Sequence, residues 1–166
     1  MTRLMRDSTN LNDIPIDGTE LVAGYVNGLF VATKEDFARF HGIPHVHIDV
    51  LGTDPQDAGV LDFEASNVRI PDTCATWVKR RKAAFPNHYP PVIYCSRGQH
   101  TPLFNAMNAA GLEVVKDFRF WIATLDGTKM LADMTGVTAV QFAGETMTGG
   151  HYDESIVFDD DWHRSP

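Results

Sequence analysis

The 166-residue sequence has few cysteines, no long apolar run and fewer basic than acidic residues. Its two cysteines, Cys74 and Cys95, fall in a predicted helix and a predicted strand, which favours buried thiols over a disulfide framework. They form no Cys-x-x-Cys pattern, so we expect no metal site built on them. No stretch reaches the roughly 18 apolar residues of a membrane span, and the first residues lack the apolar core of a signal peptide. We therefore expect a protein made in the cytoplasm, without a membrane partner.

The charge balance narrows the classes of partner. With 14 basic and 22 acidic residues the formal net charge is −8, which argues against binding to nucleic acid or to anionic membranes. The only basic run, residues 79–82, lies in a predicted helix, where it is most simply the solvated face. The acidic tail, residues 159–163, is predicted to lie at the surface. A hydrophobic fraction of 43% over this length indicates one globular domain spanning residues 1–166.

Strand and helix patterns alternate through the first two thirds of the chain, and three strands with little helix follow. The predicted strands cover residues 3–7, 21–26, 45–50, 59–64, 92–95, 118–123, 137–142 and 156–158. Helices are predicted to begin at Lys34, Pro71 and Thr101, the first with a capping box formed by Thr33 and Asp36. Eight strands is the number that closes a small barrel with a filled interior. We therefore predict an α/β fold, a TIM-like barrel with short connections.

Two carboxylates end one of these strands. In the stretch from Gly59 to Glu64, side chains alternate between faces, so Asp62 and Glu64 share a face and Phe63 points away. Acidic residues at the carboxyl end of a parallel barrel strand are where such barrels keep their chemistry. A close carboxyl pair splits into one group with a raised pKa and one with a lowered pKa, which suits glycoside hydrolysis. The alternative is that both are loop residues that cap the next helix.

A second pattern of possible ligands lies on the strand at residues 45–50. His45, His47 and Asp49 alternate with apolar residues and share one face. The apolar face is predicted to lie beneath the outer helices, through Val46, Ile48 and Val50. A His-x-His pair on a barrel strand is how many metal-dependent hydrolases begin a metal site, with His151 as a further candidate. The alternative, which we prefer, is that these residues form hydrogen bonds inside a polar barrel interior.

Four motifs, in this order along the chain, resemble those of the family 25 glycoside hydrolases. They are Asp7-Ser8-Thr9, Asp62-Phe63-Glu64, Trp121-Ile122-Ala123, and Gln141-Phe142 followed by Gly149-Gly150-His151-Tyr152-Asp153. The family comprises lysozymes with a barrel of eight strands and five helices, so the resemblance implies a (β/α)5(β)3 variant. The chain is most similar to short family-25-like domains of actinobacterial and phage proteins. It departs from the family pattern at Val140, where members usually have Trp.

The resemblance implies cleavage of β-1,4 links in peptidoglycan with net retention. On this basis Glu64 is expected to be the general acid and later the base. Asp62 is expected to stabilise the positive charge that forms when the substrate's N-acetyl group attacks. Asp7 and Asp153 are expected to hold sugar or water and to tune the pair. Capping of a helix or turn is the alternative for these last two residues.

The same resemblance implies a set of substrate-binding side chains. Trp121, Tyr94 and Tyr25 are expected to form an aromatic floor or wall, and Gln141 to donate a hydrogen bond. Ordinary core packing is the alternative for each aromatic residue.

The leading prediction is a peptidoglycan-cleaving hydrolase from a phage or prophage that needs no metal or cofactor. Its partner would be peptidoglycan or a related glycan, and it would be associated with a virion or released at lysis. One alternative is a non-catalytic barrel of the same fold, built into a virion beside other virion proteins or used to bind cell-wall sugar. The other is a metal-dependent hydrolase.

Overall fold

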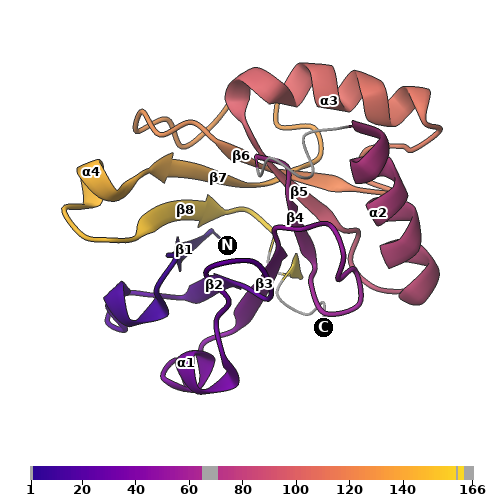
Figure 1. Ribbon diagram of the computed structural model, residues 1–166. Coiled ribbons are helices and arrows are strands. Elements are labelled where there is room, and N and C mark those ends of the chain that lie inside the picture. Colours follow the sequence, from indigo (N-terminus) through magenta and orange to yellow (C-terminus); the bar gives the residue numbers. More distant parts are fainter. Residues whose placement is uncertain (1, 65–70, 160, 163–166) are drawn as a thin grey trace.

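Eight strands close into a barrel in which each strand pairs with its neighbours in chain order (Figure 1). The computed structural model describes residues 2–64, 71–159 and 161–162. The strands are β1 (Arg3–Asp7), β2 (Leu21–Tyr25), β3 (His45–Asp49), β4 (Val60–Asp62), β5 (Val92–Ser96), β6 (Arg119–Ala123), β7 (Val137–Ala143) and β8 (Asp153–Val157). Strands β1 to β7 run parallel, and β8 lies antiparallel between β7 and β1. The predicted α/β barrel is confirmed.

Short helices and turns connect most of the strands. The helical elements are η1 (Leu11–Asp13), α1 (Lys34–Ala38), α2 (Pro71–Ala84), α3 (Arg97–Ala109) and α4 (Glu145–Thr148). The two long helices, α2 and α3, pack side by side against one side of the barrel (Figure 1). The connection from β3 to β4 consists of bends and turns, which leaves the outer face of β3 without a long covering helix. The short connections expected from the sequence are therefore present.

Side chains alternate between the barrel interior and its outer surface along each strand. One apolar cluster takes alternate residues from the strands and fills the interior: Met5, Leu21, Ala23, Val46, Ile48, Val60, Val92, Trp121, Ala139 and Val157, joined by Trp162. A second cluster lies beneath α2 and α3 and includes Leu61, Phe63, Ile93, Cys95, Phe120, Ile122 and Val140. Burial of these two sets of apolar side chains provides the main driving force for the fold. Trp162 is 2% exposed, so the prediction that the whole tail lies at the surface is wrong.

Two local predictions for the helices need correction. Helix α3 begins at Arg97 rather than at Thr101, because Ser96 and Gln99 form a capping box that precedes Pro102 by several residues. In the basic run on α2, Arg81 is buried and its guanidinium donates hydrogen bonds to the carbonyl oxygens of Pro55 and Gln56. Arg81 thus supplies hydrogen-bond donors to carbonyl groups in the connection from β3 to β4, which has no helix to provide backbone donors. The predicted capping box of α1 is confirmed.

The predicted orientation of β3 is wrong. Val46 and Ile48 point into the barrel, whereas the rings of His45 and His47 lie on the outer face, 4.8 and 4.9 Å from the ring of Phe37. The outer face of β3 is only partly covered, so the polar alternate residues belong there and the aliphatic ones inside. His45 and His47 are therefore not part of a polar barrel interior.

Asp49 is fully buried and ties three elements together on that outer side. Its carboxylate accepts hydrogen bonds from Trp77 Nε1 on α2 at 2.8 Å and from Asn27 Nδ2 after β2 at 2.8 Å. It also accepts from the backbone N–H groups of Leu51, Gly52 and Asp54. A buried carboxylate with this many donors is fully compensated, which makes its loss expensive.

None of the helices in the described part of the chain combines the length and the apolar character that crossing a membrane requires.

We expect the substitution Asp49→Ala to lower the free energy of unfolding by at least about 2 kcal/mol, because it leaves several buried donors without an acceptor. Urea denaturation followed by tryptophan fluorescence measures the change, with Asp17→Ala on an exposed loop as the control. A loss no larger than that of the control would mean that Asp49 does not hold α2 to the barrel.

Candidate active site

Four carboxyl groups lie at the end of the barrel where the parallel strands finish. Asp7 is the last residue of β1 and Asp62 the last of β4. Asp153 is the first residue of the antiparallel strand β8 and lies directly opposite Asp7 in the register. Glu64 follows β4 by two residues, in a turn, so β4 is shorter than the strand predicted at residues 59–64. Strand β8 is longer than predicted, and Asp153 therefore lies in it rather than ahead of it.

A small hollow opens at this end of the barrel. It is lined by Asp7, Tyr25, Ile48, Asp62, Tyr94 and Trp121. About 170 Å³ in and above the hollow is unfilled by atoms, and this volume includes space open to solvent. The enclosed part has room for roughly one water molecule. Five of the eight side chains predicted for the site thus share one hollow, although they come from five different strands.

A hydrogen bond within the turn after β4 fixes the carboxylate of Asp62. The backbone N–H of Glu64 donates a hydrogen bond of 2.8 Å to Asp62 Oδ1. Asp62 is 8% exposed and lines the hollow, while Phe63 packs in the outer cluster and Glu64 is half-buried. Glu64 follows Asp62 by two residues, and its charge is among those that raise the pKa of Tyr25 and Tyr94 at the hollow. The arrangement holds Asp62 still and leaves Glu64 closer to solvent.

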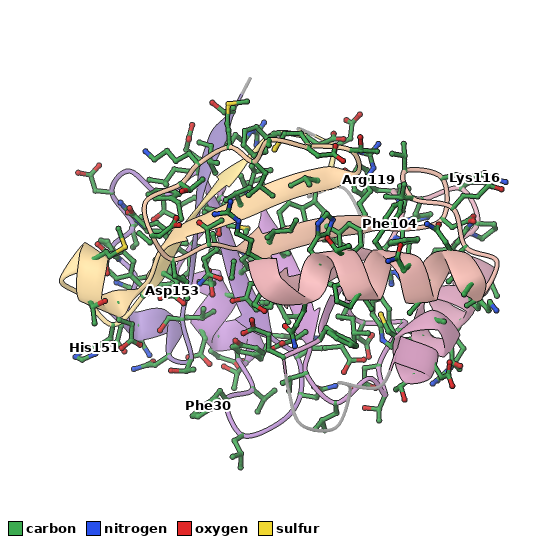
Figure 2. The ribbon with its side chains drawn as sticks, turned by 90° about the horizontal axis from the view of Figure 1, so that it is seen from above. Phe30, Phe104, Lys116, Arg119, His151 and Asp153 are labelled. Carbon is green, nitrogen blue, oxygen red and sulfur yellow. The ribbon has the colours of Figure 1, made fainter. Side chains whose placement is uncertain are left out.

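A chain of hydrogen bonds joins the opposite wall to β8. Tyr94 Oη donates to Gln141 Oε1 at 2.5 Å, and Gln141 Nε2 donates to Asp153 Oδ2 at 2.5 Å. Gln141 is 1% exposed, so its amide cannot turn to a partner in bulk water. Gln141 was predicted to donate a hydrogen bond as a substrate-binding residue, and in this structure its amide donates to Asp153. Figure 2 shows Asp153 beside α4, with His151 nearby at the exposed edge of the molecule.

Trp121 lines the hollow and is almost fully buried. Its Nε1 donates to Ser155 Oγ at 3.0 Å, and its ring meets those of Tyr94 and Trp162 edge-on at centroid distances of 4.8 and 5.7 Å. The side chain is 1% exposed, so it forms a floor and offers no broad stacking surface. Ser155 was missed because β8 was predicted to begin one residue after it.

Burial and negative charge act together on the groups of the site. Burial raises the pKa of Asp7 well above its ordinary range, and the charges of Asp153 and Asp62 raise it further. The pKa of Asp153 is also raised, first by burial. The pKa values of Tyr25 and Tyr94 are raised mainly by burial and then by the surrounding acids. The hollow therefore favours neutral tyrosine hydroxyls and opposes full ionisation of its carboxyl groups.

Two predicted features lie away from this hollow. Val140, where the sequence departs from the family pattern, packs in the outer cluster beneath the helices. The histidines of β3 lie on the outer face of the barrel, and His47 Nδ1 is 3.1 Å from the carbonyl oxygen of Asp57. Across residues 2–64, 71–159 and 161–162, no three His, Cys, Asp or Glu side chains are grouped as metal ligands would be.

The chain matches no model of a known protein family and no curated protein sequence. Solved structures with the same arrangement do exist. A muramidase from Acremonium alcalophilum matches with a TM-score of 0.56 and 14% sequence identity, over 99% of this chain and 96% of the other. A family 25 glycosyl hydrolase from Bacillus anthracis matches with a TM-score of 0.56 and 10% identity, over 98% and 92% of the two chains. The chain therefore has the lysozyme-like barrel fold of the family 25 glycoside hydrolases, over essentially its whole length.

Proposed function

We propose that this protein is a retaining glycoside hydrolase that cleaves the β-1,4-linked glycan of peptidoglycan. The observation that carries the proposal is the convergence of Asp7, Asp62, Tyr25, Tyr94 and Trp121 on one hollow, with Glu64 and Asp153 beside it. A hollow at the carboxyl end of the parallel strands is where barrels of this kind hold their reacting groups. The likeness to a muramidase and to a family 25 glycosyl hydrolase supports the choice of substrate.

In the proposed reaction Glu64 donates its proton to the glycosidic oxygen as the bond to the anomeric carbon breaks. The carbonyl oxygen of the substrate's own N-acetyl group forms the new bond to that carbon and gives a cyclic cation. The Asp62 carboxylate, held by the N–H of Glu64, lies opposite the positive charge and stabilises it. A water oxygen then attacks the anomeric carbon and breaks its bond to the N-acetyl oxygen, while Glu64 takes a proton from that water. The second attack restores the starting configuration at the anomeric carbon.

The remaining residues of the site are assigned to binding and positioning. Asp7 and Asp153 hold the sugar or the water and tune the central pair. Tyr25 and Tyr94 form the walls of the hollow and Trp121 its floor. Gln141 holds Tyr94 and Asp153 in place through one hydrogen bond to each. No step in this scheme uses a metal ion or a cofactor. A phage or prophage origin, with virion proteins as further partners, stays a prediction from the sequence.

A non-catalytic sugar-binding domain is the second candidate. The small room in the hollow, about that of one water molecule, favours it. A glycosidase must admit a whole sugar ring beside its carboxylates. The two candidates differ in whether Glu64 is required for bond cleavage or only contributes to the shape and charge of the surface.

We expect Glu64→Gln to reduce the release of reducing ends from purified peptidoglycan by about 10²–10⁴-fold, because the variant has no proton to donate. Binding to the same peptidoglycan should survive, since glutamine preserves the shape and most hydrogen bonds. Glu35→Gln, an exposed substitution on α1 that removes the same charge, serves as the matched control. Equal turnover by Glu64→Gln and the control would rule out Glu64 as the general acid. A wild-type protein that binds peptidoglycan but releases no reducing ends would favour the binding domain.

We also expect Asp62→Asn to impair turnover, because the developing positive charge loses its counter-charge. The fall should appear in kcat more than in KM, since the interaction is strongest in the transition state. Steady-state kinetics on a soluble β-1,4-linked fragment of peptidoglycan separate the two parameters. A rise in KM with unchanged kcat would instead assign Asp62 to ground-state binding.

A further inference from the structure

Asp7 and Asp153 form a cross-strand pair at the mouth of the barrel. They are register partners in the antiparallel ladder of β1 and β8. Side chains of directly opposite residues in such a ladder lie on the same face, with Cβ atoms about 4.5–5.5 Å apart. Both carboxyl groups therefore project to the same side, toward the hollow that Asp7 lines.

The surroundings of the pair contain negative charges and uncharged hydroxyls. Asp7 is 7% exposed, and its Oδ1 is buried without a hydrogen-bond partner. Within the described part of the chain, neither Asp7 nor Asp153 has a Lys, Arg or His within ion-pair distance. The neighbouring basic residue on β1, Arg6, pairs with Glu154 at 3.0 Å on the alternate face.

The groups that act on the pair come from every element around it. They are Tyr25 of β2, Asp62 of β4, Glu64 of the following turn, Tyr94 of β5, Gln141 of β7, and Glu145 of α4, beside which His151 lies at 3.9 Å. All but the exposed His151 are acidic or uncharged at neutral pH. Two ionised carboxylates facing each other here would repel each other, and a third, Asp62, would add to the repulsion.

We propose that Asp7 and Asp153 share one proton at neutral pH, so that the pair carries a single negative charge. The identity of the ligand that the pair binds rests on the proposed function, whereas the shared proton does not. The hydrogen bond from Gln141 stabilises the charge on Asp153, whereas Oδ1 of Asp7 has no hydrogen-bond partner in the described part of the chain. The proton therefore resides on Asp7, and Asp153 is the ionised member.

A neutral Asp7 changes what the hollow can bind. A protonated carboxyl is a hydrogen-bond donor, while an ionised one can only accept. A protonated Asp7 then offers a donor at the hollow that it lines, to an acceptor oxygen of an uncharged sugar such as the carbonyl oxygen of an N-acetyl group. Burial and the charges of Asp153 and Asp62 raise the pKa of Asp7, which likewise favours its protonated form.

The pair also makes stability depend on pH, and the sign follows from linkage. The pKa of Asp7 is higher in the folded than in the unfolded chain, so the folded state binds the proton more tightly. The stability gained is fully present below the unfolded pKa of about 3.9 and is lost as the pH rises through the folded pKa. Asp7→Asn mimics the protonated acid and removes this dependence.

The test compares melting temperatures of the wild type, Asp7→Asn and Asp17→Asn between pH 4 and pH 8, about the unfolded pKa and above. Asp17 is an exposed loop acid, so its variant removes the same charge without touching the pair. We expect Asp7→Asn to gain several degrees over the wild type as the pH rises, and Asp17→Asn to show a much smaller change. A gap that stays constant with pH, or a destabilised Asp7→Asn at pH 8, would overturn the shared proton.

Infrared difference spectroscopy supplies a second readout that needs no enzymatic activity. The carbonyl band of a protonated carboxyl should be present in the wild type at pH 7 and absent in Asp7→Asn. If the wild type and the variant show no difference in that band, Asp7 is ionised and the proposal fails. If the band is lost, the proton is on Asp7 whatever the protein does to glycan.

Binding of a soluble trimer of β-1,4-linked N-acetylglucosamine tests the donor. Wild-type affinity should fall by about tenfold as the pair loses its proton at high pH, while that of Asp7→Asn should not show this fall. A parallel decline in both proteins would contradict the donor role. Absence of any trimer binding would speak against the glycan function, while the melting and infrared results would still decide the protonation of the pair.

Discussion

The antiparallel pairing of β8 with both β1 and β7 is the interaction on which the site depends. Without it the seven parallel strands would form an open sheet with two unpaired edges. The pairing closes the barrel and brings Asp153 opposite Asp7. It also places Ser155 under Trp121 and Asp153 within reach of Gln141. One strand of five residues therefore both removes the edges and completes the polar wall of the hollow.

Alternation of side chains explains how much of the fold could be predicted. Short apolar runs bounded by turn residues located all eight strands, with strict alternation in the strand at residues 45–50, and the Asp62 motif was correctly placed at the carboxyl end of β4. Alternation separates two faces but does not say which one points inward. On β3 the choice made from the sequence was wrong, because the connection after it lacks a helix and its outer face is left to polar residues such as His47. The short connection after β3 was expected from the sequence, but its consequence for the outer face of β3 was not drawn.

The other misses have similar causes. Arg81 is charged and lies in a basic run, yet it is buried because the carbonyl groups of a helix-free connection need donors. The start of β8 was missed because Asp153 and Glu154 read as loop residues, although Asp153 and Ser155 face the interior in the closed barrel. Polar residues inside a barrel mouth weaken the strand signal at the same positions where a site is built. The site residues could be named from the motifs, but their contacts could not.

The electrostatics of the hollow bear on the choice between enzyme and structural domain. Burial of Asp7 beside Asp153 and Asp62 opposes ionisation, and no described basic side chain offsets it. Such a group costs stability, which the rest of the fold must compensate. A domain selected only for stability would therefore gain by replacing it with a neutral or apolar residue. In contrast Asp49, which is fully buried, is satisfied by donors from three elements and is structural. Buried Asp49 thus receives donors from three elements, whereas Oδ1 of buried Asp7 has no hydrogen-bond partner in the described part of the chain, as is expected of a group kept for its chemistry.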